Sequence, residues 1–345
     1  MKARAALALL LIAASIAIAY QVRTTQQAAT PASLTAYVPQ DALLTIESPD
    51  FAALLHQWTN SAESKSWLAS DNHAVFQNSR LFGRLKDAQT SFATAAGIPA
   101  SVDLLNQVAG KQSVFAWYDI GKLEFLYITR MPAAQADNAQ LFQARASFER
   151  RHAGNSDFYI RTSGADYGTV AFARVPGASG DLVLLATRED LIANALKLIA
   201  AASPANSIRQ QAWFRDVSAA LPAQKPAPVL HMVLNLDRIV VDPHFRSYWI
   251  QRNITWTRQF RAAASDLYIE SGRFREERVL LPNSTRTAAN LNLAPLTALV
   301  PASTGVYRAT AVRDPAVAVT AIQEKLLGRS TTAVKEMKLS LMKIH

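Results

Sequence analysis

The sequence predicts an α+β fold: a largely antiparallel sheet built from hairpins, with helices packed on one face. Strand-like segments follow one another in pairs across short turns that contain glycine, as in residues 113–129 around Gly121-Lys122. Segments with helical periodicity lie between these pairs. No regular β-α-β alternation and no glycine-rich strand-to-helix turn is present, so a parallel doubly wound sheet is not expected.

The folded sequence begins at Leu34 and opens with one strand and three helices. Asp50 is a suitable N-cap for the first helix, and Ser101 or Asp103 caps the third. Gly97-Ile98-Pro99 separates the second helix from the third. The expected elements are a strand over 42–47 and helices over 51–69, 74–96 and 102–108.

The middle of the chain changes to the two-residue period of strands and then alternates strands with amphipathic helices. The segment 229–236 is the best candidate for a central strand, since it is apolar almost throughout. The expected elements are hairpin strands over 113–120 and 123–129, a helix over 137–151, strands over 158–162, 169–175 and 181–187, helices over 189–202 and 207–220, the strand 229–236, a helix over 243–264, and a hairpin over 265–281 around Ser271-Gly272.

The first 23 residues have the form of an export signal. Lys2 and Arg4 precede an apolar run over 5–19, and polarity returns at Gln21. The run is about 15 residues long, shorter than the ~20 that a helix needs to cross the hydrocarbon core, which favours cleavage after Ala19. The density of Leu and Ile and the basic flank favour retention as a single anchor with the N-terminus in the cytoplasm. Both interpretations remain open, and retention is preferred.

Composition bounds the rest. The chain has 345 residues, half of them apolar, so it can bury a substantial core. It has no cysteine, so an exported form would have no disulfides, and thiolate metal sites and cysteine nucleophiles are excluded. The net charge of +10 arises from 36 basic and 26 acidic residues that are mixed along the chain. This diffuse basicity favours contact with anionic lipid or envelope polymer, and no nucleic-acid role is expected for a protein that leaves the cytoplasm.

An internal similarity divides the chain. A polar linker over 24–33 is followed by an α+β domain over 34–284 and by a last segment over 285–345. The string Leu34-Thr-Ala-Tyr-Val-Pro39 recurs as Leu296-Thr-Ala-Leu-Val-Pro301. The last segment is therefore expected to be either a partial second repeat or a C-terminal extension.

The segment Val38-Pro39-Gln-Asp-Ala-Leu-Leu-Thr-Ile-Glu-Ser-Pro-Asp-Phe51 and the step Asp103-Leu-Leu-Asn-Gln-Val-Ala-Gly-Lys111 resemble an uncharacterised bacterial family. Its members are exported or membrane-anchored envelope proteins known as a domain of unknown function. The resemblance covers roughly 34–281. It implies an envelope location and supplies no catalytic residue.

The search for catalytic motifs is negative. The sequence has no His-Glu-x-x-His, no phosphate loop and no Gly-x-Ser-x-Gly elbow. No two of its histidines are spaced i, i+4; they are His56, His73, His152, His231, His244 and His345. No catalytic, cofactor-binding or metal-binding residue is therefore assigned, and no cofactor is expected.

One polar constellation has two interpretations. Asp237, Asp242 and His244 follow the best strand, where carboxylates and imidazole can bind metal or transfer protons. The simpler interpretation, which we favour, makes the aspartates turn and cap residues around Pro243 and places His244 on the surface. His231 is interpreted as a half-buried histidine of the sheet.

Aromatic residues and arginines are interleaved in the helix expected over 243–264. Such a face suits an anionic lipid or polysaccharide, with rings for stacking and guanidinium groups for paired contacts. The alternative, which we favour, is a core-facing aromatic stripe edged by arginine stems. The candidate contact residues are Arg246, Trp249, Arg252, Trp256, Arg258 and Arg261. The segment Arg273–Arg278 is expected to be a solvated strand face with cross-strand ion pairs.

These observations predict a non-catalytic binding or scaffolding protein of the bacterial cell envelope. It would be anchored in the inner membrane with its domain in the periplasm or outside; a cleaved form would be periplasmic or secreted. Its expected partners are the membrane, through the N-terminal segment, and another envelope protein or an anionic polymer. The alternatives are an exported hydrolase or transferase with a site near Asp237 and His244, and a truncated gene product.

Overall fold

The computed structural model describes residues 33–119, 121–122, 124–164, 168–201, 205–222, 226–244, 257–270 and 273–283, and residues 298, 300 and 301. The export segment, the linker up to residue 32 and the second copy of the internal similarity lie outside these residues, apart from those last three. The chain divides into two compact units, Met1–Ser284 and Thr285–His345, and all the elements below belong to the first. Within the described residues, no helix has the length and hydropathy of a membrane span.

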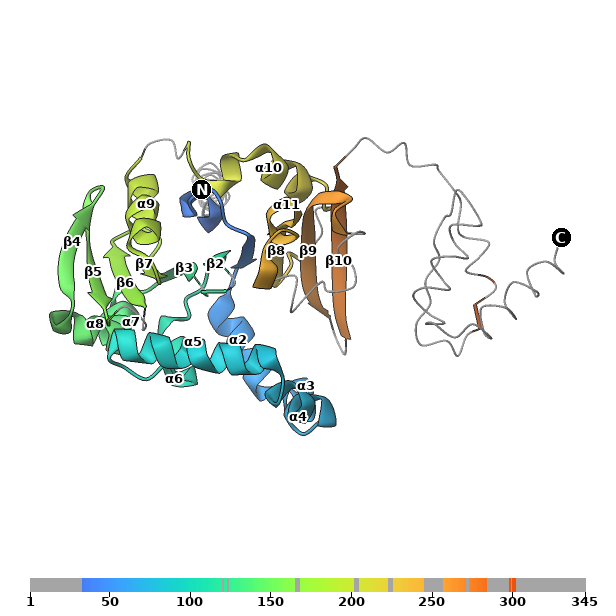
Figure 1. The fold of residues 1–345 in the computed structure, drawn as a ribbon, viewed down its shortest axis with the longest axis horizontal. Helices are drawn as coiled ribbons and strands as arrows, with labels where there is room; N and C mark the ends of the chain where they lie inside the picture. Colours follow the sequence, from blue (N-terminus) through green and yellow to red (C-terminus); the bar gives the residue numbers. More distant parts are fainter. Residues whose placement is uncertain are drawn as a thin grey trace, which may run out of the picture. The chain divides into compact units, whose positions relative to one another are not determined.

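A single antiparallel sheet of ten strands forms the centre of the first unit (Figure 1). The strand order is β10-β9-β8-β1-β2-β3-β7-β6-β5-β4. The strands are β1 Leu44–Ser48, β2 Ser113–Asp119, β3 Glu124–Met131, β4 Glu149–Ala153, β5 Ser156–Thr162, β6 Thr169–Val175, β7 Asp181–Ala186, β8 Leu230–Asn235, β9 Phe260–Glu270 and β10 Arg273–Pro282. The expected antiparallel α+β architecture is confirmed.

Helices cover both faces of the sheet, so the prediction of helices on one face is wrong. Figure 1 shows α9 and α10 on the upper face and α2, α5 and α6 on the lower face. The α-helices are α2 Phe51–Asn60, α3 Ala62–Leu68, α4 Asp71–Gln77, α5 Arg80–Ala96, α6 Val102–Val108, α7 Ala133–Asn138, α8 Gln140–Gln143, α9 Glu189–Ala200, α10 Ala212–Ala219 and α11 Leu236–Ile239, and the 3-10 helices are η1 Leu34–Tyr37, η2 Ala144–Ser147 and η3 Ile208–Gln210.

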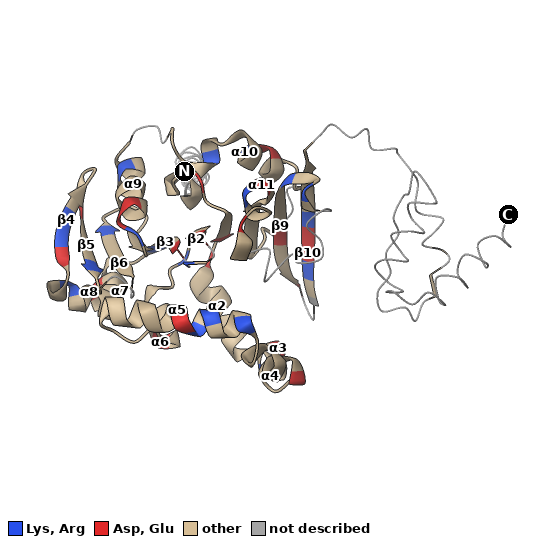
Figure 2. Ribbon diagram, in the orientation of Figure 1, with Lys and Arg blue, Asp and Glu red and all other residues tan. Residues whose placement is uncertain are grey.

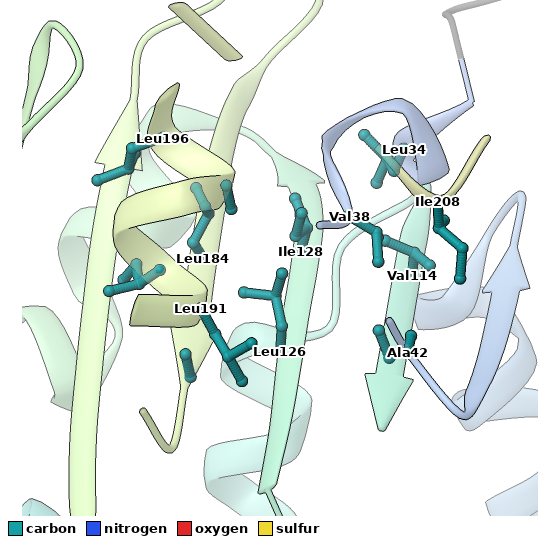
Figure 3. Close-up of a cluster of buried hydrophobic side chains, with 14 of the residues drawn as sticks. Leu34, Val38, Ala42, Val114, Leu126, Ile128, Leu184, Leu191, Leu196 and Ile208 are labelled. Carbon is teal, nitrogen blue, oxygen red and sulfur yellow. The ribbon is translucent and has the colours of Figure 1, made fainter. Parts of the chain in front are cut away.

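Strand β7 explains the two-sided cover, since every one of its residues is buried. Leu182 and Leu184 contribute to the upper core, whereas Val183 and Leu185 contribute to the lower core. A strand buried on both faces has no polar alternation, so its sequence does not reveal how many faces are covered. The upper core joins α9, η1 and η3 to the sheet through Leu34, Val38, Val114, Leu126, Ile128, Leu184, Leu191, Leu196 and Ile208 (Figure 3).

Two expected helices end differently in the structure. The helix over 137–151 is replaced by α7, α8 and η2, and Glu149–Ala153 forms the edge strand β4. Its charged residues are exposed, and pairing with β5 overrides their helical tendency. The helix over 243–264 is wrong from Arg258 onward, because residues 258–259 form a turn and β9 begins at Phe260. The run Ala262–Ala264 is buried between β8 and β10.

The helix expected over 51–69 is divided in two at Ser61. The Ser61 backbone closes α2, and its side-chain oxygen accepts a hydrogen bond from Ser64 N, which begins α3. The hairpins expected over 113–129 and 265–281 are confirmed as β2–β3 and β9–β10.

The two faces of the β8–β10 end of the sheet are covered unequally. On the upper face, α10 packs against all three strands, and Ala262, Ala264 and Tyr268 are buried there. On the lower face, Leu267 and Ile269 are only half-buried and Phe274 is exposed. Charge does not separate the faces, since Figure 2 shows basic and acidic residues interspersed over the sheet and its helices.

Candidate functional site

An apolar groove lies between α2 and the lower face of the sheet. It consists of two adjoining chambers, which share Phe51, Leu54 and Leu230. The outer chamber has a volume of about 780 Å³ and is lined by Phe51, Leu54, Leu55, Gln57, Trp58, Ser61, Glu63, Leu230, Leu267, Ile269, Glu270 and Phe274. The inner chamber has a volume of about 400 Å³ and is lined by Ile46, Ser48, Phe51, Leu54, Leu105, Val108, Ser113, Phe115, Phe125, Tyr127, Leu185 and Leu230.

Helix α2 supplies one wall of the groove. Phe51, Leu54, Leu55 and Trp58 follow the i, i+3, i+4, i+7 spacing that places side chains on one helical face. Asp50 fixes the start of the helix, because its Oδ1 accepts a hydrogen bond of 2.9 Å from Ala53 N. No residue of α2 is fully buried, and Trp58 is 43% exposed. The apolar face of this helix therefore borders a hollow instead of packing into a core.

The sheet supplies the opposite wall through strand alternation. Leu230 in β8 and Leu267 in β9 are direct cross-strand partners and lie on the lower face. Ile269 and its partner Phe274 continue this apolar row onto β10. These side chains line the outer chamber, so the row forms a continuous apolar floor across three strands.

The inner chamber ends at a small polar group. Tyr127 donates a hydrogen bond of 3.1 Å to the Val108 carbonyl, and its oxygen lies 3.2 Å from Ser113 Oγ. Burial raises the pKa of the Tyr127 phenol, so the hydroxyl stays neutral at physiological pH. Ser48 also lines this chamber, and its buried hydroxyl has no hydrogen-bond partner within the described residues. An unpaired buried hydroxyl is unfavourable, which suits a site that receives a polar ligand atom.

The surroundings of the groove are unusually apolar. Nearly all the large apolar side chains that are exposed in the described part of the chain belong to α2–α6 or to β10, and Val241 is the exception. Scattered exposed apolar residues are ordinary, whereas a concentration on one layer indicates a surface for lipid or for another apolar partner. The members are Trp58, Trp67, Leu68, Val75, Leu85, Val102, Leu105 and Phe274.

The constellation expected around Asp237 is not gathered into a cavity. Asp237 is exposed on α11, and His244 is exposed with its ring against Gly121 in the β2–β3 turn, where an added Cβ would lie 2.4 Å from the imidazole. Neither residue lines a cavity in the described part of the chain that also holds a second titratable side chain of this constellation. No cluster of three or more potential metal-ligating side chains occurs in the described ranges. The hydrolase or transferase alternative stays a prediction without a cavity to support it.

His231 is half-buried in β8, as expected, and it has a partner that sequence reasoning missed. Its Nδ1 lies 2.6 Å from Oδ1 of the buried Asp266, its cross-strand neighbour in β9. The pair lies on the upper face, away from the groove. Only the β8–β9 register brings these two residues together, and no local signal in the sequence predicts that register.

The arginine and aromatic residues expected to form a contact surface are only partly described. Arg246, Trp249, Arg252 and Trp256 lie outside the described residues. Arg258 is exposed in the turn before β9, where its carbonyl accepts a hydrogen bond from Asn283 Nδ2. Arg261 lies on β9 and forms an ion pair of 2.8 Å with Asp216 of α10. The proposed helical face therefore does not extend to Arg261.

The charged β10 segment forms a cross-strand ion pair, as expected, and also ion pairs along the strand. Arg275 pairs across the strands with Glu270 at 2.6 Å, and its guanidinium lies 4.0 Å from the centre of the Tyr268 ring. Arg278 pairs along β10 with Glu276 at 2.7 Å. Because Arg275 is the cross-strand partner of Tyr268, the Arg275–Glu270 ion pair lies with Tyr268 on the upper face of the sheet.

Comparison of this chain with protein-family models, with curated proteins and with solved structures finds no match. The resemblance to a family of envelope proteins therefore stays a prediction. The functional assignment rests on the chemistry of the described residues.

Proposed function

We propose that this chain is a non-catalytic binding protein of the bacterial cell envelope, which holds an acyl chain in the groove between α2 and the sheet. The observation that carries the proposal is the pair of adjoining chambers, whose walls are formed mostly by apolar side chains. Ligand sites of proteins are typically concave and apolar, with few polar groups that set the ligand's orientation. In the groove, Ser48 and Tyr127 are such groups.

The expected binding energy is adequate for this role. Each methylene transferred from water to an apolar site contributes about 0.8 kcal/mol, so a segment of ten methylenes supplies about 8 kcal/mol before the entropic cost of association. A carboxyl or ester oxygen at the inner end would accept a hydrogen bond from Ser48. That bond would relieve an unpaired buried hydroxyl, which favours an acyl chain over a plain alkane.

The envelope location in this proposal rests on the N-terminal segment. A basic flank followed by an apolar run directs a chain to the membrane, whether or not the run is later removed. A protein held at the membrane surface meets acyl chains at high local concentration. The exposed apolar side chains of α2–α6 fit contact with the same surface.

Photocrosslinking in a membrane tests the proposal. The full chain is reconstituted in phosphatidylcholine vesicles with a trace of palmitic acid that carries a diazirine in mid-chain, and crosslinked peptides are mapped by mass spectrometry. We expect adducts within α2 and on Leu267 or Ile269. Adducts found only in the first 23 residues would contradict the proposal.

A matched pair of variants makes the test specific. Leu54→Asp places a charge between the two chambers and should reduce crosslinking at least about tenfold, because an unpaired charge is costly in an apolar site. Val241→Asp introduces the same charge at an exposed apolar position outside both the groove and the apolar surface of α2–α6, and should leave crosslinking unchanged. Equal yields from the two variants would remove the groove from the proposal.

A further inference from the structure

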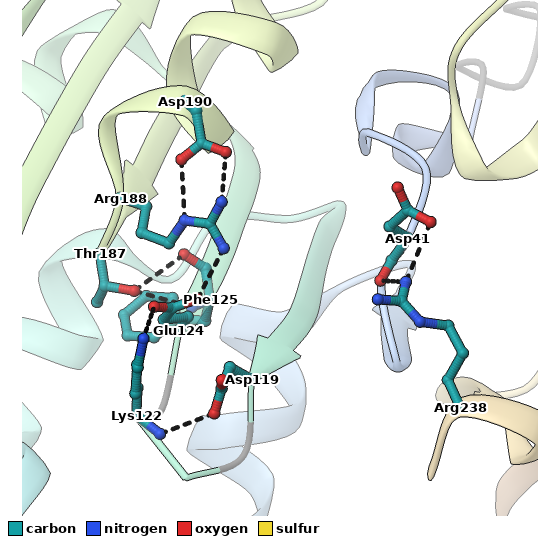
Figure 4. A network of polar contacts seen from close by, with 9 residues as sticks. All are labelled: Asp41, Asp119, Lys122, Glu124, Phe125, Thr187, Arg188, Asp190 and Arg238. Atoms are coloured by element: carbon teal, nitrogen blue, oxygen red, sulfur yellow. Dashed lines mark hydrogen bonds and ion pairs between the residues drawn. The ribbon is translucent and has the colours of Figure 1, made fainter. Parts of the chain in front are cut away.

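A second hollow, on the upper side of the sheet, has the opposite character. It lies between α9 and the loops that contain residues 39–41 and 205–206, and its volume is about 620 Å³. Its walls carry charged and amide side chains. Figure 4 shows Arg188 and Asp190 on one side and Arg238 with Asp41 on the other. No residue that lines the groove between α2 and the sheet also lines this polar cavity.

The wall formed by residues 39–41 is held in place from three directions. Asp41 has φ +80°, the only positive value for a non-glycine residue in the described ranges, and Arg238 Nη1 donates to both its carbonyl and its Oδ1. Gln40 N donates to the Asn206 carbonyl at 3.0 Å. Tyr118 donates to the Pro39 carbonyl at 2.8 Å. A strained residue fixed by its neighbours indicates a preformed wall, which lowers the cost of ordering on binding.

The cationic side chains of the cavity differ in how many of their N–H donors already have a partner. Arg188 is neutralised by Asp190 at 2.9 Å and by Glu124 at 2.7 Å. Arg238 uses only Nη1 on Asp41, so Nε and Nη2 have no partner within the described residues. Lys197 is exposed on α9 and forms no ion pair in that part of the chain. The cavity therefore retains positive hydrogen-bond donors that can bind an anionic group.

The other polar groups decide what kind of anion fits. Gln40, Asn194 and Asn206 present amides, which both donate and accept hydrogen bonds. Asp41 and Asp190 present carboxylates, which only accept hydrogen bonds. Inorganic phosphate has little to donate to these carboxylates, whereas the hydroxyl groups of a sugar can donate to them and also accept from the amides.

We propose that the polar cavity binds an acidic sugar, a pyranose ring bearing a carboxylate. Its carboxylate binds Lys197 and the free side of Arg238, and its hydroxyls bond Asn194, Asn206 and Asp190. The site is independent of acyl-chain binding in the groove, so either proposal can fail alone.

Titration of the full chain in phosphatidylcholine nanodiscs tests this inference. Glucuronic acid is the probe, glucose and inorganic phosphate are the comparators, and binding is followed by saturation-transfer NMR and calorimetry. We expect glucuronic acid to bind at least about tenfold more tightly than glucose, since its carboxylate forms a charge-assisted hydrogen bond to Lys197 or Arg238 that glucose cannot form. Equal binding of glucose, tighter binding of phosphate, or no binding of glucuronic acid would each overturn the inference.

Two variants, each of which replaces one exposed lysine by glutamine, locate the site. Lys197→Gln should weaken glucuronic acid binding about tenfold while keeping the helix intact, because Gln has a helix propensity close to that of Lys. Lys86→Gln removes the same charge from an exposed position of α5 and should change nothing. A parallel loss in both variants would show that only the net charge matters, which would overturn the site.

Discussion

The polar cavity and the apolar groove are built by opposite means. The polar cavity beside α9 is shaped by hydrogen bonds and ion pairs that reach between distant segments, such as Arg238 to Asp41 and Gln40 to Asn206. The groove between α2 and the sheet exists because the apolar face of α2 and the apolar row of side chains on β8–β10 lie opposite each other without filling the space between them. Hydrogen bonds and ion pairs give the polar cavity a rigid wall with donors and acceptors in fixed directions. The groove offers apolar contact area, which attracts a ligand without fixing its orientation.

Alternation along a strand gives the two faces of one sheet unlike chemistry. In β8, Leu230 faces the groove while its neighbour His231 faces upward and pairs with Asp266. Each function proposed here depends on residues of one face only. Substitutions on one face should therefore leave the other site intact.

The largest expected effect is on the free energy of unfolding, and it distinguishes a residue of the packed core from a residue of the groove wall. Leu184→Ala removes a fully buried side chain from the upper core and should lower the free energy of unfolding by about 2–5 kcal/mol. Leu54→Ala removes the same atoms from a half-exposed position beside a hollow and should lower it by less than about 1 kcal/mol, since little packing is lost. Urea unfolding followed by circular dichroism measures both. Equal losses would show that α2 is packed as a core helix and that the groove is closed.

The second effect concerns the strained wall of the polar cavity. Arg238→Ala frees Asp41 from the contacts that hold its positive φ and should lower the free energy of unfolding by about 1–2 kcal/mol. Adding Asp41→Gly should restore most of this loss, because glycine adopts a positive φ without steric penalty. Urea midpoints of the two variants and of Asp41→Gly alone complete the cycle. A double variant less stable than Arg238→Ala would mean that the wall is not strained.

A smaller effect of opposite sign is expected at the inner end of the groove. Ser48→Ala removes a buried hydroxyl that has no partner in the described residues, so the ligand-free protein should gain about 1 kcal/mol of stability. The same variant should weaken capture of palmitic acid more than capture of hexadecane, because only the acid has an oxygen to accept the Ser48 hydrogen bond. Thermal unfolding and competition with the diazirine probe measure the two quantities. A loss of stability in Ser48→Ala would place the hydroxyl in a hydrogen bond and remove it from recognition.

Much of the fold is predictable from the sequence because it is locally encoded. The Gly121-Lys122 turn and the alternation around it define the β2–β3 hairpin, and the apolar spacing of Leu191, Leu196 and their neighbours defines α9. Strand β4 is not predictable in this way, since Glu149–Ala153 is charged and becomes a strand only by pairing with β5.

The two sites depend on contacts that sequence cannot reveal. The spacing of Phe51, Leu54 and Trp58 predicts α2, but no sequence signal shows that its apolar face is left uncovered. Arg238 and Asp41 lie 197 residues apart, and their contact follows from the order of the strands. Strand order and register are set by the whole domain, so residues that look unremarkable in sequence form both hollows.

The smallest expected effect is a pH dependence at the β10 rim of the groove. The hydrogen bond from Ser265, followed by the charge-assisted bond from Arg278, holds the pKa of Glu276 below its usual range. A carboxyl group with a depressed pKa stabilises the folded state above its unfolded pKa of ~4.3, and this contribution is lost as the pH falls through the lower folded value.

Because the Glu276 side chain is 42% exposed, solvent screening limits this contribution to less than about 1 kcal/mol. Urea midpoints measured at pH 7 and pH 3 should therefore differ slightly less for Glu276→Gln than for the natural chain. Glu63→Gln, which removes an exposed carboxylate of α3 near the same groove, serves as the comparison. A larger acid-induced loss of stability in Glu276→Gln would contradict this account. It would mean that the Ser265–Glu276–Arg278 contacts do not hold β10 against β9, so this edge of the sheet would not support the outer wall of the groove.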